Sequence, residues 1–300
     1  MSGLGAILAA DKPVLGVVAA ISLGASDFLA AKTARHAGSV LGGVVTSGAA
    51  MAICAAMVLF PPGVPEPPPP GGLGYCLSGS ALMGLGSVAF FAGLKQGPVT
   101  VVSPLSSTYP IITTVVGVTL FGAPLTAAQL VSIAALTIGV LLAGGLLNHP
   151  TQSPGRRIGP PLGVLTALLW GLGYPLISQG MMLVGWKRGT FLEFTVITMV
   201  FAAIAVAGRF GTGQLAWRAM RSPAVIACGA AQVLGVAALN VALEDGAGQN
   251  SVLIATALSA TYPTLTVLLA LRHFRERVSP TELVGALTSV TAVIALTLFS

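Results

Sequence analysis

The sequence predicts an all-helical integral membrane protein with about ten transmembrane helices, arranged as two inverted five-helix repeats. Three observations lead to this prediction: scarce charge, charge-free runs longer than a membrane span, and an internal repeat. Hydrophobic residues make up 55% of the chain and charged residues only 7%, whereas a soluble protein carries about 25% charged residues. No Asp, Glu, Lys or Arg occurs in the ranges 36–65, 67–94 and 96–155. Each range exceeds the roughly 18–20 apolar residues that cross a ~30 Å hydrocarbon core.

The predicted crossings follow one another with short connections. A polar stretch at 148–161 separates a first repeat, 1–147, from a second, 162–300. A proline-rich run at 61–72 predicts an extended spacer, and Gly122-Ala123-Pro124 predicts a turn. Residues 1–10 contain no basic residue, so we expect no cleavable signal peptide. The crossings are predicted at 13–32, 39–60, 72–94, 98–121 and 126–147, and then at 162–183, 190–208, 222–243, 248–271 and 280–299.

The internal repeat is the most informative feature of the sequence. Residues 99–140 align without a gap onto residues 252–293. At the centre, Leu-Ser-Ser-Thr-Tyr-Pro-Ile-Ile-Thr matches Leu-Ser-Ala-Thr-Tyr-Pro-Thr-Leu-Thr, with six of nine positions identical. Because each repeat has an odd number of crossings, the second enters the membrane from the opposite side. Inverted repeats of this kind recur in secondary transporters, whose substrate site lies between the repeats near the midplane.

Three motifs give the chain a family resemblance. They are the two Thr-Tyr-Pro helices, the turn Arg275-Glu-Arg-Val-Ser279, and Gly24-Ala-Ser-Asp-Phe28 in the first helix. With these motifs the chain resembles the ten-helix EamA-type transporters of the drug/metabolite transporter superfamily, over nearly its whole length. The turn at 122–126 departs from the pattern because it lacks Glu and Arg. The resemblance implies transport of amino acids, other metabolites or toxic compounds, and it leaves the substrate open.

Two prolines lie inside predicted helices, at equivalent positions of the repeat. Pro110 and Pro263 lack an N–H, so the carbonyls four residues earlier lose their helical partners. Within a membrane such breaks are tolerated only inside protein or beside water. Hydroxyl residues share one helix face near each proline. They predict either the walls of a central cavity or packing kinks with hydroxyls bonded to their own backbone. The hydroxyl residues are Ser106, Tyr109 and Thr113 in the first half, and Ser259, Tyr262 and Thr266 in the second.

Asp27 is the strongest single candidate for a residue that binds a proton or the substrate. It lies five residues, or about 8 Å, from the end of the first predicted helix. A charged carboxylate deeper in the membrane costs about 2.5–3.5 kcal/mol or more. Either Asp27 binds a proton or a cationic group of the substrate, or it lies near the interface and pairs with Lys32 or Arg35 for structure.

Further polar residues in the second half are candidates for the same cavity. Glu193 either takes part in coupling or is held by the interfacial cluster at 186–188. Gln232 and Asn240 lie eight residues apart on one helix face, and Trp170 and Tyr174 lie four apart on another. Both stripes suit a cavity wall that contacts a substrate, and both equally suit interhelical hydrogen bonding.

Motifs favour a transporter over an enzyme. A Ser-His site needs a histidine at membrane depth, but His36, His149 and His273 lie in predicted loops or at helix ends. Asp27 and Asp245 lack the context of an aspartyl protease, and the sequence contains no HExxH zinc motif and no P-loop. We therefore expect no catalytic residue, no metal site and no cofactor. The net charge of +6 comes from short loops, which argues against a nucleic-acid partner.

We expect a secondary transporter in the cell membrane, working by alternating access around a cavity between the repeats. Scarce intramembrane charge favours export of a small neutral or zwitterionic metabolite, such as an amino acid. Protons are the candidate coupling ion, and the chain would act in the lipid bilayer as a monomer or a homodimer. The alternatives are a multidrug exporter, a lipid or glycolipid flippase on the same fold and, more remotely, an intramembrane enzyme.

The two indications of orientation conflict. With a cytoplasmic N-terminus, the inner loops hold only Lys12, Lys187 and Arg188 of the basic residues. The positive-inside rule therefore favours external termini. The family resemblance implies cytoplasmic termini.

Overall fold

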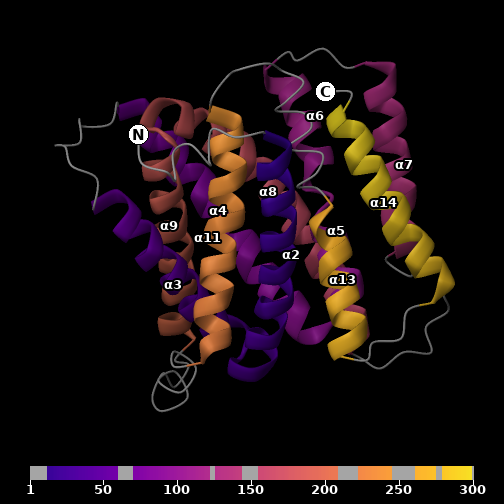
Figure 1. Cartoon of the computed structure of the whole chain (residues 1–300), viewed down its shortest axis with the longest axis horizontal. Helices are drawn as coiled ribbons and strands as arrows, with labels where there is room; N and C mark the ends of the chain where they lie inside the picture. Colours follow the sequence, from indigo (N-terminus) through magenta and orange to yellow (C-terminus); the bar gives the residue numbers. More distant parts are fainter. Residues whose placement is uncertain are drawn as a thin grey trace.

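The computed structural model describes residues 12–59, 70–121, 126–143, 155–208, 222–244, 261–274 and 279–298. Every regular element in these ranges is a helix, and the helices form one bundle (Figure 1). The first half holds α2 (Lys12–Ala37), α3 (Ser39–Leu59), α4 (Pro70–Gln96), α5 (Val99–Ser106), α6 (Tyr109–Phe121) and α7 (Ala127–Ala143). The second half holds α8 (Gly155–Val184), α9 (Trp186–Ala207), α11 (Pro223–Glu244), α13 (Tyr262–His273) and α14 (Pro280–Leu298).

Six of the described helices are long and apolar enough to cross a membrane, namely α2, α3, α4, α8, α9 and α11. Apolar side chains such as Val131, Met182 and Met199 are more than 60% exposed on the outside of the bundle. Such a surface suits lipid, since the helices satisfy their own backbone hydrogen bonds. The helix α7 is shorter, and the predicted crossing at 248–271 is described only from residue 261 onward. Ten crossings therefore stay a prediction.

The first helix is longer than the sequence predicts. It continues to Ala37 rather than ending near residue 32. Asp27 consequently lies ten residues from the C-terminal end of α2, or about 15 Å at 1.5 Å per residue. The predicted depth of about 8 Å was wrong, because no proline or glycine interrupts the helix between Asp27 and Ala37. The carboxyl group belongs to the middle of the bundle rather than to its rim.

The prediction that Pro110 and Pro263 lie inside continuous helices was also wrong. The predicted crossing at 98–121 is two helices, α5 and α6, separated by a turn at Ser107 and Thr108. Pro110 is the second residue of α6, and Pro263 is the second residue of α13. A proline costs little in a first helical turn, because the N–H that it lacks has no intrahelical partner there. The prolines therefore begin helices instead of kinking them.

Three consecutive hydroxyl groups complete the hydrogen bonding at the end of α5. Ser106, Ser107 and Thr108 each donate a side-chain hydrogen bond to the carbonyl three residues earlier, at 2.8, 2.8 and 2.7 Å. A helix end leaves carbonyls without intrahelical donors. The Ser103 and Leu105 carbonyls also accept the backbone N–H groups of Ser107 and Thr108, at 3.0 and 3.3 Å. Backbone and side-chain donors together therefore satisfy the carbonyls at this break, as a membrane interior requires.

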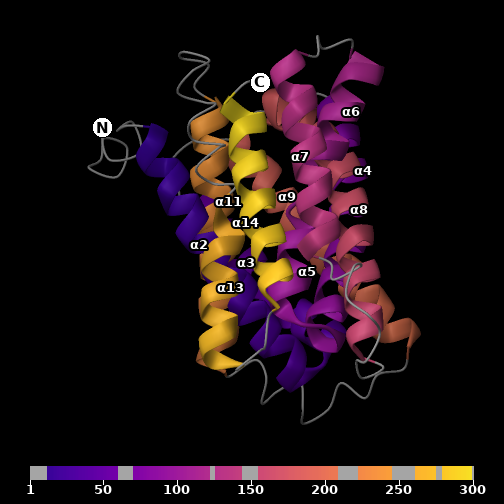
Figure 2. The ribbon, with the colours of Figure 1, turned by 90° about the vertical axis from the view of Figure 1, so that its right-hand side faces the viewer.

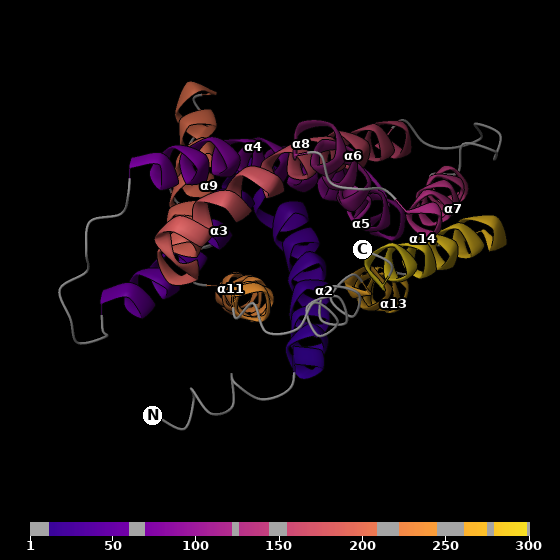
Figure 3. The ribbon, with the colours of Figure 1, turned by 90° about the horizontal axis from the view of Figure 1, so that it is seen from above.

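The packing between the halves is the same when the halves are exchanged. The helix α4 packs along α8 as α11 packs along α2, and α4 meets α9 as α11 meets α3. In the same way, α13 packs on α2 and α6 packs on α8, while α3 pairs with α9 and α7 with α14. The α7–α14 pair lies at one edge of the bundle (Figures 2 and 3). A two-fold relation between the repeats accounts for all of these pairings.

Two glycines mark equivalent hairpins in the halves. Gly38 joins α2 to α3 with φ of 90°, and Gly185 joins α8 to α9 with φ of 80°. A Cβ at either position would meet nothing within 4 Å. Backbone conformation rather than space therefore requires glycine, since positive φ is costly for other residues.

Two threonines make equivalent contacts between the halves. The Thr266 hydroxyl of α13 donates to the Gly24 carbonyl of α2, at 3.0 Å. The Thr113 hydroxyl of α6 donates to the Gly171 carbonyl of α8, at 3.2 Å. Thr113 and Thr266 are aligned in the sequence repeat. The structure therefore shows that Gly24 and Gly171 are equivalent positions of the repeat, although both lie outside the gap-free sequence alignment.

Candidate functional site

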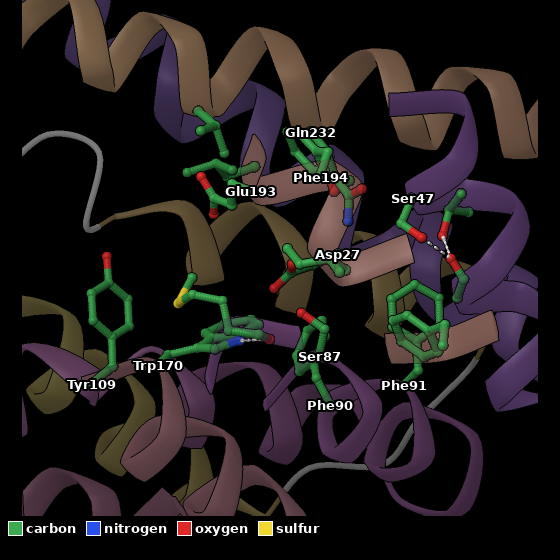
Figure 4. Close-up of a pocket in the computed structure, with 18 of the residues that line it drawn as sticks. Asp27, Ser47, Ser87, Phe90, Phe91, Tyr109, Trp170, Glu193, Phe194 and Gln232 are labelled. Carbon is green, nitrogen blue, oxygen red and sulfur yellow. Dashed lines mark hydrogen bonds between the residues drawn. The ribbon is translucent and has the colours of Figure 1, made fainter. Parts of the chain in front are cut away.

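A cavity lies in the middle of the bundle, between helices of both halves (Figure 4). The space that the centre of a water molecule can occupy in this cavity is about 90 Å³. By the same measure, one water needs roughly 10–15 Å³. It therefore holds several waters or a small organic group. It is lined by Leu23, Ser26, Asp27, Gly43, Thr46, Ser47, Met83, Ser87, Phe90, Phe91, Tyr109, Trp170, Tyr174, Glu193, Phe194, Ile197, Phe201, Gln232, Val236 and Tyr262.

The two halves line the cavity with corresponding positions but different residues. Since Gly24 corresponds to Gly171, three residues further along each helix Asp27 corresponds to Tyr174. The aligned tyrosines Tyr109 and Tyr262 both line the cavity as well. The repeat thus supplies a symmetric frame, while the carboxyl group of Asp27 has an aromatic ring as its counterpart.

Asp27 is buried and has a defined partner. Its side chain is 8% exposed, and its Oδ2 accepts a hydrogen bond of 2.7 Å from the Ser103 hydroxyl of α5. Lys32 is exposed. Arg35 donates to the carbonyls of Leu94 and Gly97, at 3.2 and 3.1 Å. Among the described residues, therefore, a serine rather than either basic residue holds Asp27.

Glu193 is buried in the cavity wall without such a partner. It is 5% exposed, and none of the described residues donates a hydrogen bond or an ion pair to its carboxyl group. Lys187 of the interfacial cluster lies over the Trp186 ring, at 5.7 Å from the centroid. Figure 4 shows Asp27 and Glu193 pointing into the same space, with Tyr109 and Trp170 across from them.

Aromatic rings form another wall of the cavity. The rings of Tyr109 and Tyr174 are stacked, with centroids 4.7 Å apart and planes at 13°. Trp170 lies 6.3 Å from Tyr109 and 5.2 Å from Phe90, and its indole N–H donates to the Met83 carbonyl at 3.2 Å. That hydrogen bond fixes the indole plane beside the cavity. Rings held in this way can stack on an apolar or cationic group.

Several predicted site residues serve packing instead of lining the cavity. Asn240 donates to the Thr190 hydroxyl at 2.9 Å, which joins α11 to α9, while Gln232 of the same stripe lines the cavity. Thr113 and Thr266 hold the glycine carbonyls described above, and Pro263 is fully buried. Thr113 and Thr266 share helix faces with Tyr109 and Tyr262, but of these four residues only the tyrosines line the cavity.

Ser106 also serves its own helix. Its hydroxyl donates to the Ser103 carbonyl of α5 at 2.8 Å, and it is not among the residues that line the cavity. Ser259 and the side chain of Pro110 lie outside the described part of the structure.

Sequence reasoning missed Ser103, which holds Asp27, and the phenylalanines of the cavity wall. Ser103 was not a candidate because its partner is 76 residues away and no local pattern joins them. Phe90, Phe91 and Phe201 form a run of ring contacts, at 6.4 Å and 5.4 Å, on α4 and α9. Apolar side chains in an apolar helix carry no signal that separates cavity from lipid. Among the described residues, no group of three or more His, Cys, Asp or Glu could hold a metal ion.

The fold and the site define a helical membrane protein whose two repeats enclose a central cavity, with a few polar groups in a largely apolar and aromatic wall. The model of the EamA-like transporter family matches residues 13–145 and 157–298. The chain therefore belongs to the EamA-like transporter family, with one EamA unit in each half.

Solved structures agree with this fold. One of them, described as "Crystal structure of protein", has a TM-score of 0.62 and 16% sequence identity, covering 96% of this chain and 99% of its own. At that identity the likeness shows the fold alone. In total, 27 chains of solved structures match, while the comparison with curated proteins finds no match.

Proposed function

We propose that this membrane transporter exports a small neutral or zwitterionic metabolite, such as an amino acid, across the cell membrane. The observation that carries the proposal is a central cavity, which residues of both halves line. In alternating access, two halves that share one site rock against each other and expose it to either side in turn. The proposal includes an inverted relation between the repeats, which the exchangeable helix packing supports.

The lining of the cavity favours a substrate without net negative charge. Two carboxyl groups, Asp27 and Glu193, and no Lys, Arg or His lie among the described residues around it. An anionic substrate such as a sugar phosphate would meet like charge without a basic partner, at a cost of several kcal/mol. Asp27 and Glu193 are also the groups through which protons would couple to transport.

Export from proteoliposomes or from cells, measured across a panel of amino acids and drugs, tests the proposal. We expect gradient-driven movement of at least one neutral or zwitterionic compound, and none of sugar phosphates. Protein-free vesicles and a Gly24→Leu variant give the background. Transport of a strongly anionic compound would contradict the proposed substrate class.

The same measurement separates the alternatives. The small volume of the cavity suits a metabolite better than a lipid headgroup. Movement of several unrelated drugs would instead indicate a multidrug exporter. Movement of a labelled lipid, together with no transport on the panel, would indicate a flippase.

The paired tyrosines give a second prediction. Replacing Tyr109 or Tyr262 by alanine should lower the transport rate about 3–10-fold while leaving membrane insertion intact, because a ring contact contributes about 0.5–1.5 kcal/mol. Tyr109→Phe should keep most of the rate, since it retains the ring that stacks on Tyr174. Tyr75 is 43% exposed on α4 and provides the control, so Tyr75→Ala should transport normally. Unaltered transport in both Tyr109→Ala and Tyr262→Ala would remove these residues from the site.

A further inference from the structure

The two carboxyl groups of the cavity differ in what already satisfies them. Asp27 accepts a 2.7 Å hydrogen bond from Ser103, on another helix of the same half. Glu193, on α9, has no donor among the described residues, although it is buried with only 5% of its surface exposed. A buried carboxylate without a donor is unfavourable, so Glu193 has an unmet requirement for a donor or a positive charge.

The surroundings of Glu193 favour an organic cation in that place. No basic side chain of the described residues lines the cavity, and Glu193 shares the cavity with Tyr174, which stacks on Tyr109. Trp170 is fixed beside these rings by its bond to Met83. A cation beside a carboxylate and over aromatic faces gains both an ion pair and cation–π attraction.

The repeat gives Glu193 no acidic counterpart. The glycines Gly38 and Gly185 begin equivalent helices, which places Glu193 in register with Thr46 of α3. Both residues line the cavity. The Thr46 hydroxyl donates a hydrogen bond to the Gly42 carbonyl of the same helix, at 2.8 Å. Negative charge without a resident partner is thus confined to one wall of the site.

We propose that Glu193 binds the ammonium group of the substrate, with the aromatic wall holding the substrate's apolar body. The cavity then selects small amines and ammonium zwitterions over neutral and anionic molecules of the same shape. Asp27, already held by Ser103, has a separate role in the transport cycle. The inference rests on the proposed function because it names the substrate class of the same site.

Isothermal titration of the full chain in detergent tests the assignment without requiring transport. The probes are 2-phenylethylammonium, 2-phenylethanol and phenylacetate, which share a ring and differ in charge. We expect the ammonium compound to bind at least 10-fold more tightly than the alcohol, and phenylacetate to show no binding. Glu193→Gln should bring the ammonium compound to the affinity of the alcohol. Glu193→Asp should keep a reduced preference, which controls for any effect of substitution on folding.

The competing assignment is tested in parallel with Asp27→Asn, which should retain the preference for the ammonium compound. Equal binding of amine and alcohol by the unmodified chain, or no binding of any probe, would overturn the inference. So would a preference that survives Glu193→Gln but is lost in Asp27→Asn. Transport of panel compounds without any preference for ammonium compounds would contradict this inference and leave the proposed transport function standing. Glu193-dependent binding without transport would instead contradict the proposed function.

Discussion

Replacing Asp27 by asparagine is expected to lower transport by at least about 10-fold while the chain still inserts and folds. The carboxyl group lies about 15 Å from the end of α2, where a charge costs roughly 2.5–3.5 kcal/mol. Asparagine has nearly the same shape, and its side-chain oxygen can still accept the Ser103 hydrogen bond. The variant therefore removes the ability to carry charge and little else. Initial rates in proteoliposomes, normalised to inserted protein, measure the effect.

Ser103→Ala is the matched variant for Asp27→Asn. It leaves the carboxyl group in place without its donor, and an unsatisfied buried acceptor costs about 1–3 kcal/mol. We expect the thermal midpoint in detergent to fall in Ser103→Ala but to change little in Asp27→Asn. Normal transport by Asp27→Asn would show that Asp27 serves structure alone.

Alanine at Gly24 or Gly171 is expected to destabilise the chain by about 1–3 kcal/mol, the usual cost of overpacking. A Cβ on Gly24 would lie 2.6 Å from the Tyr262 carbonyl oxygen, and one on Gly171 would lie 2.8 Å from the Tyr109 carbonyl oxygen. In both cases the obstacle is backbone, which cannot rotate away. The helices must separate instead, and the threonine hydrogen bonds to these glycines lengthen.

Both glycine variants should also lose transport, because Asp27 and Tyr174 follow one turn later on the displaced helices. Gly74→Ala is the control: it lies in α4 with nothing within 4 Å of the added Cβ. There alanine should be neutral or stabilising by up to about 1 kcal/mol, since it favours helix. Thermal midpoints and transport rates are compared across the three variants. An unchanged midpoint in Gly24→Ala and Gly171→Ala would contradict the close packing of α2 on α13 and of α8 on α6.

The sequence alone determined the class of this protein. Long charge-free runs predict membrane helices, and the family match confirms the predicted membership of the EamA-type transporters. Tyr109 and Tyr262 were found by their place in the repeat, and both line the cavity. These features are readable because hydropathy and repetition are properties of segments, which do not depend on what the segment packs against.

The tertiary structure decided which polar residues face the cavity and which hold helices together. Gln232 and Asn240 share one face by spacing, yet one lines the cavity and the other bonds to Thr190. Asp27 meets Ser103 across 76 residues, and Glu193 meets no donor among the described residues. The spacing of residues along a helix fixes which side chains share a face. It does not fix what lies opposite that face, because the helices of one half pack mainly on those of the other.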